Sequence, residues 1–252
     1  ATIWIKGGSD MDSFCKKGTN YILSSLLTRG CEGFDHLKLA QYIESYGAEL
    51  NQEVFEDGTY ISIKSLNEHF NKLLPLIDLM VERPLLKKCQ FEKVKQFTLN
   101  TLKRDKENPF NVTFERWRKI VYSRHPYAFN TMGYEKDVSR ISYKDILTEF
   151  EKFKLRDKYI ISNNYMINET KIGILSQKKF KDQINFINND LTQEDRFVSS
   201  NNKSDQIILM LGNQTCSRES NEYFPLKILE SHLSYGMSSV LFKLFREKNG
   251  IT

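Results

Sequence analysis

Three hydroxyl side chains near the start of the chain are spaced to share one face of a helix. Tyr21, Ser24 and Ser25 stand at positions i, i+3 and i+4 within the stretch from Gly18 to Gly30, and residues three and four apart are neighbours on a helix. Hydroxyls placed together can act as nucleophiles, but no histidine lies nearby in sequence and no nucleophile elbow surrounds the serines. As metal ligands they are poor, because zinc sites use imidazole, carboxylate or thiolate donors.

The same stretch resembles the zinc helix of the pitrilysin, insulysin and mitochondrial processing peptidase family, the inverzincins, which reads Gly-x-x-His-x-x-Glu-His before an apolar run and a Gly. In this resemblance Tyr21 and Ser25 match the two histidine ligands, and Ser24 matches the glutamate general base. The third ligand, a glutamate on a later helix, matches Thr101, which begins the stretch Thr-Leu-Lys-Arg-Asp-Lys-Glu-Asn-Pro over 101–109. We therefore expect no metal in this chain and zinc only in a catalytic partner.

Further segments resemble the family in the same order along nearly the whole chain. They are 1–9, 43–51, 59–63, the turn at 125–127, the Gly-Met-Ser-Ser-Val-Leu-Phe run at 236–242 and the Arg-Glu-Lys-Asn-Gly run at 246–250. The resemblance implies two substrate-binding residues. Asn51 matches an asparagine on the strand that binds peptide by strand addition. Arg246 matches an arginine that works with a tyrosine shortly after it to hold substrate from the second domain.

Both substrate-binding assignments have a plainer alternative. Asn51 could be a hairpin residue that faces solvent. Arg246 could be an exposed helix charge that pairs with Glu247, an interaction worth well under about 1 kcal/mol at a surface. Both alternatives stay open at the level of the sequence.

Composition limits the classes of protein to which the chain can belong. With 252 residues, 40% of them hydrophobic and 12% aromatic, the chain can bury a sizeable core. The net charge of +5 is mild and both signs are interspersed, so no nucleic-acid partner is expected. No apolar run approaches the roughly 18 residues of a transmembrane segment. Four scattered cysteines without a Cys-x-x-Cys pair favour free thiols in a reducing cytoplasmic or organellar soluble compartment.

The order of the predicted elements defines the fold class. Apolar periodicity, capping residues and turn signals predict helices over 18–29, 35–46, 66–83, 87–106, 110–122, 143–153, 225–233 and 236–246. They predict strands over 2–5, 49–55, 60–65, either 159–161 or 165–167, 171–175 and 206–211. Asp57-Gly58 joins two of the strands as a hairpin turn. This order predicts an α+β fold with helices packed on one face of a mainly antiparallel sheet. By resemblance it is the half-domain repeat of a processing-peptidase-like metallopeptidase.

Composition also predicts the domain boundaries. Residues 191–204 are polar and lack apolar periodicity, which is typical of a linker. We expect a first peptidase-like domain over 1–190 and the start of a second, truncated repeat over 205–252. By resemblance the intact protein has one more strand before residue 1 and more of the second domain after residue 252.

The resemblance implies a non-catalytic subunit or inactive paralogue that shapes a chamber and binds peptide substrate for a related catalytic metallopeptidase chain. An alternative is a structural core subunit of a larger complex with the same fold. A third, an active hydrolase with other ligands, would need a cluster of carboxylates and histidines that the sequence does not reveal.

Overall fold

The computed structural model describes residues 1–123, 125–161, 197–199 and 207–251. The chain forms two compact units, Ala1–Met210 and Leu211–Thr252, and each unit is described by itself below. Most of the predicted linker, 191–204, and the strands predicted over 165–167 and 171–175 lie outside the described residues. The predicted boundaries at 190 and 205 therefore stay predictions.

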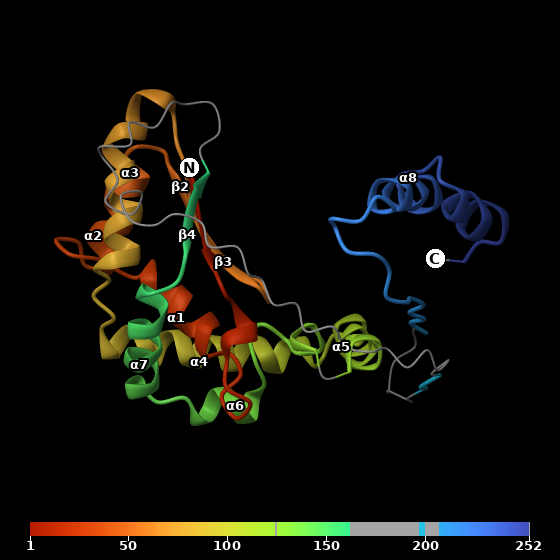
Figure 1. Ribbon diagram of the computed structural model, residues 1–252, viewed down its shortest axis with the longest axis horizontal. Coiled ribbons are helices and arrows are strands. Elements are labelled where there is room, and N and C mark those ends of the chain that lie inside the picture. The colour runs from red at the N-terminus through yellow and green to blue at the C-terminus, as the bar shows by residue number, and fades with distance from the viewer. Residues whose placement is uncertain (124, 162–196, 200–206, 252) are drawn as a thin grey trace. The chain divides into compact units, whose positions relative to one another are not determined.

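The first unit is built on a four-stranded antiparallel sheet of order β2-β3-β1-β4 (Figure 1). Its strands are β1 (Thr2–Lys6), β2 (Glu49–Val54), β3 (Gly58–Lys64) and β4 (Lys158–Ile161). The predicted hairpin joins β2 to β3, so that Glu49 pairs with Lys64 and Val54 with Thr59. Within the described residues β2 pairs with β3 alone, which leaves β2 at an edge of the sheet.

Successive side chains of each strand point to opposite faces of the sheet, and one of these faces is buried. Ile3 and Ile5 of β1 are buried beside Ile61 and Ile63 of β3. Helices α1 (Thr19–Leu27), α2 (His36–Ser45) and α3 (Asn67–Glu82) lie together on one side of the strands (Figure 1). This arrangement confirms the predicted α+β class with helices on one face of an antiparallel sheet.

Further helices complete the first unit. They are α4 (Lys88–Asp105), α5 (Pro109–Tyr122), α6 (Glu135–Arg140) and α7 (Tyr143–Lys154), with short 3-10 turns η1 (Ser9–Met11) and η2 (Pro126–Ala128). Asp35 caps α2 by accepting a hydrogen bond from the Lys38 amide at 2.9 Å. Ser142 and Asp145 form a reciprocal capping box at the start of α7. In the described part of the chain, no helix combines the length and the apolar character that a bilayer span requires.

The second unit contains α8 (Tyr223–Ser234), which confirms the helix predicted over 225–233. It also contains a π-helical turn, η5 (Phe242–Lys248), which begins later than the helix predicted over 236–246. The strand predicted over 206–211 is wrong in its described part, because residues 207–211 form neither strand nor helix. Residues 207–210 belong to the first unit and Leu211 to the second. No described strand pairs with this segment, so a strand here would leave its backbone groups to water. Ile207 is accordingly 99% exposed.

Candidate functional site

Helix α1 is held at its N-terminus by a buried carboxylate and by two glycines. Gly18 precedes the helix with a φ of +97°, and Asp12 accepts hydrogen bonds from the Gly18 amide at 2.6 Å and the Asn20 amide at 2.9 Å. A Cβ on Gly18 would lie 2.3 Å from the carbonyl oxygen of Met132, and one on Gly133 would lie 2.0 Å from that of Lys17. Only glycine permits this close approach of two backbones.

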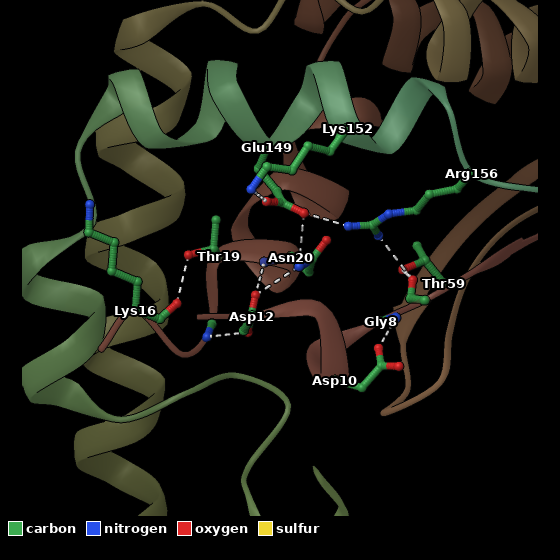
Figure 2. Close-up of polar contacts among 12 residues, drawn as sticks. Gly8, Asp10, Asp12, Lys16, Thr19, Asn20, Thr59, Glu149, Lys152 and Arg156 are labelled. Atoms are coloured by element: carbon green, nitrogen blue, oxygen red, sulfur yellow. Dashed lines mark hydrogen bonds and ion pairs between the residues drawn. The ribbon is translucent and has the colours of Figure 1, made fainter. Parts of the chain in front are cut away.

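The carboxylate of Asp12 belongs to a buried polar cluster that joins α1 to α7 (Figure 2). The Asn20 side-chain amide donates to Asp12 at 2.8 Å and faces Glu149 of α7 at 3.5 Å. Glu149 also pairs with Arg156 at 2.5 Å, and Arg156 donates to the carbonyl of Gly7 at 3.1 Å. Burial raises the pKa of Asp12 to about 6, against the hydrogen bonds that it accepts from Asn20 and Gly18.

The three hydroxyl residues lie on α1 as predicted, and a side chain from β2 connects two of them. Ser24, only 1% exposed, donates to the Oε1 of Gln52 at 2.7 Å. The Nε2 of Gln52 donates to the Oγ of Ser25 at 3.3 Å, and Ser25 donates to the backbone carbonyl of Tyr21 at 3.0 Å. The amide of Gln52 thus occupies the space beside the positions that match the glutamate base and the second histidine ligand.

Tyr21 and Thr101 are the other two positions that are expected, by resemblance, to match the family's metal ligands. Tyr21 is half-buried, and burial together with the charge of Asp105 raises the pKa of its phenol. The phenol is therefore neutral near pH 7. Thr101 is half-buried on α4, the helix that packs against α1.

These residues do not fit a zinc ion. The side chains at the four positions offer neutral hydroxyls, and Gln52 adds an amide, whereas zinc sites use imidazole, thiolate or carboxylate donors. Across the described ranges, no group of three or more His, Cys, Asp or Glu residues is placed to hold a metal ion. The four positions also hold no carboxylate or imidazole that could take a proton from an attacking water.

A pocket of about 690 Å³ opens beside the hydroxyl face of α1. Tyr21, Ser25 and Gln52 line one side of it. Its apolar lining includes the buried residues Leu39, Ile43 and Val94 and the exposed ring of Phe97, and its charged lining comprises Arg29, His36, Lys93, Glu44 and Glu49. The pocket is therefore bounded by α1, α2, α4 and the edge strand β2.

Of the two predicted substrate-binding residues, Asn51 lies on the strand beside this pocket but does not line it. Asn51 is exposed on β2 and donates to Glu49 at 3.0 Å, while its neighbour Gln52 turns to the opposite face. Arg246 belongs to the second unit, where its guanidinium lies 5.3 Å from the centre of the Phe242 ring. Their roles in binding peptide stay predictions. Gln52 was missed at the level of the sequence, although its place next to Asn51 on an alternating strand was a usable signal.

Comparison with known proteins gives consistent matches over the chain. A family model described as insulinase (peptidase family M16) matches residues 1–135, and one described as the peptidase M16 inactive domain matches residues 169–252. An uncharacterized zinc protease from Rickettsia felis is 21% identical over 252 residues, which cover 98% of this chain and 61% of that protein. The mitochondrial-processing peptidase subunit beta of Neurospora crassa is 20% identical over 159 residues, covering 63% of this chain and 33% of that protein.

Two solved structures share the fold. A peptidase M16 inactive domain from Pseudomonas fluorescens has a TM-score of 0.74 at 18% identity, covering 100% of this chain and 63% of that one. A protease from Helicobacter pylori has a TM-score of 0.73 at 17% identity, covering 98% of this chain and 62% of that one. The chain thus spans about three fifths of the length of these relatives.

Proposed function

This chain belongs to the M16 (insulinase) peptidase family, and from that premise we propose that it is a non-catalytic subunit that binds peptide for a related catalytic metallopeptidase chain. In this role the chain contributes one wall of the chamber in which a partner cuts the substrate. The partner supplies zinc and the base that activates water. The proposal concerns the whole protein, of which the present chain matches about three fifths of the length of its relatives.

The single observation that carries the proposal is the contact of Gln52 with the hydroxyl face of α1. Its amide accepts from Ser24 at 2.7 Å and donates to Ser25 at 3.3 Å. Side chains that are hydrogen-bonded to one another in this way satisfy each other's polar atoms without a metal. A catalytic zinc would need metal ligands at these positions and one coordination position left open for water. The side chain of Gln52 contacts two of these positions, Ser24 and Ser25.

The support for peptide binding comes from the edge of the sheet. Strand β2 is paired on one side by β3 and lies at the edge of the described sheet. An extended peptide can add to such an edge through backbone hydrogen bonds, with alternate side chains directed toward the same face. In the proposed role Asn51 contributes a polar side chain on the outer face of that strand, and the pocket beside Gln52 receives peptide side chains.

The support for a partner comes from a relative. The Neurospora crassa protein is by its name the beta subunit of a mitochondrial-processing peptidase, and this chain is similar to it over 63% of its own length. A chain that lacks zinc ligands gains a role in proteolysis only through a second chain that has them. We expect that second chain to carry an intact His-x-x-Glu-His helix.

Co-expression tests the proposal. The full-length protein is produced alone and together with a related chain that carries His-x-x-Glu-His, and size-exclusion chromatography, zinc content and peptide cleavage are measured for each preparation. We expect a co-eluting complex that cleaves peptides with a higher kcat/KM than either chain alone. Chelator-sensitive peptidase activity of this protein by itself would refute the proposal, and assembly without any change in kcat/KM would leave only a structural core role.

A further inference from the structure

One end of the pocket beside Gln52 is formed by three basic side chains from three helical regions, of which Arg29 and Lys93 carry the positive charge. Arg29 follows the end of α1, His36 begins α2 and Lys93 lies in the first half of α4. Among the described residues, neither Arg29 nor Lys93 forms an ion pair with a carboxylate. Asp35 lies nearby, but its carboxylate caps α2 through the Lys38 amide and does not line the pocket.

The contact between Arg29 and His36 orients the guanidinium. One of its terminal nitrogens lies 3.1 Å from the Nε2 of His36, and since an arginine can only donate, the imidazole must be neutral and accept at Nε2. Partial burial and then the charges of Arg29 and Lys93 lower the pKa of His36 and so favour that neutral form. The other donors of the guanidinium stay available to a ligand.

The opposite end of the pocket is acidic. Glu44 lies eight residues beyond His36 on α2, about 12 Å along the helix, and Glu49 begins β2. Between the two ends lies an apolar floor that includes Leu39 and Ile43. The position of a negatively charged group in the pocket therefore matters, because such a group is attracted at the cationic end and repelled at the acidic end.

We propose that Arg29 and Lys93 at the cationic end of this pocket bind an acidic side chain of the extended peptide that the proposed function places along β2. This inference rests on the proposed function and names the class of peptide that it selects. A peptide paired with β2 would direct every second side chain toward the face of Leu50 and Gln52, which both line the pocket. A fork of guanidinium donors with an ammonium beside it suits a carboxylate better than a neutral amide.

Host peptides with one acidic position test the inference. Ten-residue Thr, Ser and Val peptides with acetylated and amidated ends carry one glutamate that is moved a residue at a time, and glutamine and lysine versions are matched to each. Binding to the full-length protein is followed by fluorescence anisotropy at low ionic strength. We expect glutamate to bind roughly fivefold tighter than glutamine at one or two positions only, and the advantage to shrink at high salt.

Two charge-reversal variants on α4 distinguish binding in the pocket from an effect of the overall surface charge. Lys93→Glu should abolish the preference for glutamate and favour the lysine peptide instead. Lys88→Glu changes the same charge on α4 at a residue that does not line the pocket, and it should leave the preference intact. Both residues are exposed, so thermal unfolding curves of the two variants should match that of the wild type.

The possible failures are distinct. Equal binding of glutamate and glutamine peptides at every position, or equal effects of the two charge reversals, would overturn the inference while peptide binding itself stands. A glutamine peptide with a free C-terminus that binds tighter than every internal glutamate would also overturn it, because the site would then take a chain-end carboxylate. Absence of binding by all the peptides, even to the assembled pair, would overturn both this inference and the proposed function.

Discussion

The hydroxyl of Ser24 on α1 donates a 2.7 Å hydrogen bond to the side-chain amide of Gln52 on β2. This contact links a helix that is buried in the core to the edge strand of the sheet. Ser24 is 1% exposed whereas Gln52 is half-buried, and Gln52 lines the pocket whereas Ser24 does not. The bond is thus a packing contact at Ser24, the position that by resemblance matches the family's glutamate base.

This hydrogen bond should make a measurable contribution to stability. Ser24→Ala should lower the free energy of unfolding by about 1 kcal/mol, since it removes a buried donor and leaves the amide oxygen of Gln52 without it. Gln52→Ala should cost a similar amount, and the double variant should lose less than the sum by about 0.5–1.5 kcal/mol. Urea unfolding of the full-length protein measures all three. Ser45→Ala, at an exposed serine, is the control, and strictly additive effects would contradict the coupling.

A second prediction concerns metal binding. The purified wild-type protein should hold no stoichiometric zinc, because hydroxyls and an amide occupy the site. A variant with Tyr21→His, Ser24→Glu, Ser25→His, Thr101→Glu and Gln52→Ala should hold about one zinc per chain, since a catalytic site needs three protein ligands. Elemental analysis after gel filtration measures both. The same variant with Thr101 retained is the control and should bind zinc more weakly. Tightly held zinc in the wild type would contradict the conclusion that these residues do not fit a zinc ion.

A third prediction concerns pH and the buried cluster of Figure 2. Burial raises the pKa of Asp12 from 3.8 to about 6 in the folded chain. The folded state therefore binds the proton more tightly than the unfolded state does. The contribution of Asp12 to the free energy of unfolding is fully present below about pH 4 and is lost as the pH rises through 6. The loss amounts to roughly 2–3 kcal/mol at pH 7.

Two variants isolate this titration. The difference in unfolding free energy between wild type and Asp12→Asn should change by about 2 kcal/mol between pH 4.5 and 7, because the rest of the loss occurs below pH 4.5. Asp145→Asn is the control. Although partial burial opposes it, the Lys16 ammonium and the Ser142 cap hold the pKa of Asp145 at about 2, so its titration falls at lower pH and its difference curve should be flat in this window. Parallel curves for wild type and Asp12→Asn would contradict the prediction.

A fourth prediction tests Arg246 in the assembled pair. If its guanidinium holds substrate, Arg246→Ala should lower kcat/KM by roughly ten- to a hundredfold, about 1.4–2.8 kcal/mol, without changing association. Lys248→Ala is the matched control, since Lys248 is an exposed cation in the same π-helical turn. Steady-state kinetics and size-exclusion chromatography measure the two effects. Unchanged kinetics for Arg246→Ala would leave the second unit a scaffolding role.

Most helices and strands of the first unit could be predicted because their signals are local. The apolar spacing over 66–83 and 87–106 gives α3 and α4 within a residue of their observed ends. The capping box at Ser142 and the turn at Asp57-Gly58 are where the sequence places them. Helix α6 was not predicted, because a six-residue helix is too short to show a periodic apolar pattern. Its position depends instead on tertiary packing of the fully buried Val138 near Gly18.

The candidate site was less accessible from the sequence. The hydroxyl face of α1 follows from helical spacing alone, and the structure places Tyr21, Ser24 and Ser25 on that helix. The partner of the serines, however, comes from a strand 27 and 28 residues away. Its contribution depends on which face of β2 turns toward α1, and the register of the hairpin decides that face. Neither Gln52 nor the cationic end of the pocket is visible in any single segment.

The close approach of Gly18 and Gly133 bears on how the chain folds. The helix that carries the hydroxyl face is locked at its N-terminus by backbone from the turn before α6, more than a hundred residues later. Contacts of such long sequence separation form late, because the intervening chain must first lose its freedom. We therefore expect the N-terminus of α1 to stay unanchored during synthesis until residue 133 has left the ribosome. Cysteine labelling of stalled nascent chains should find the buried Cys31, just beyond α1, reactive in chains that end before this turn and protected in longer ones.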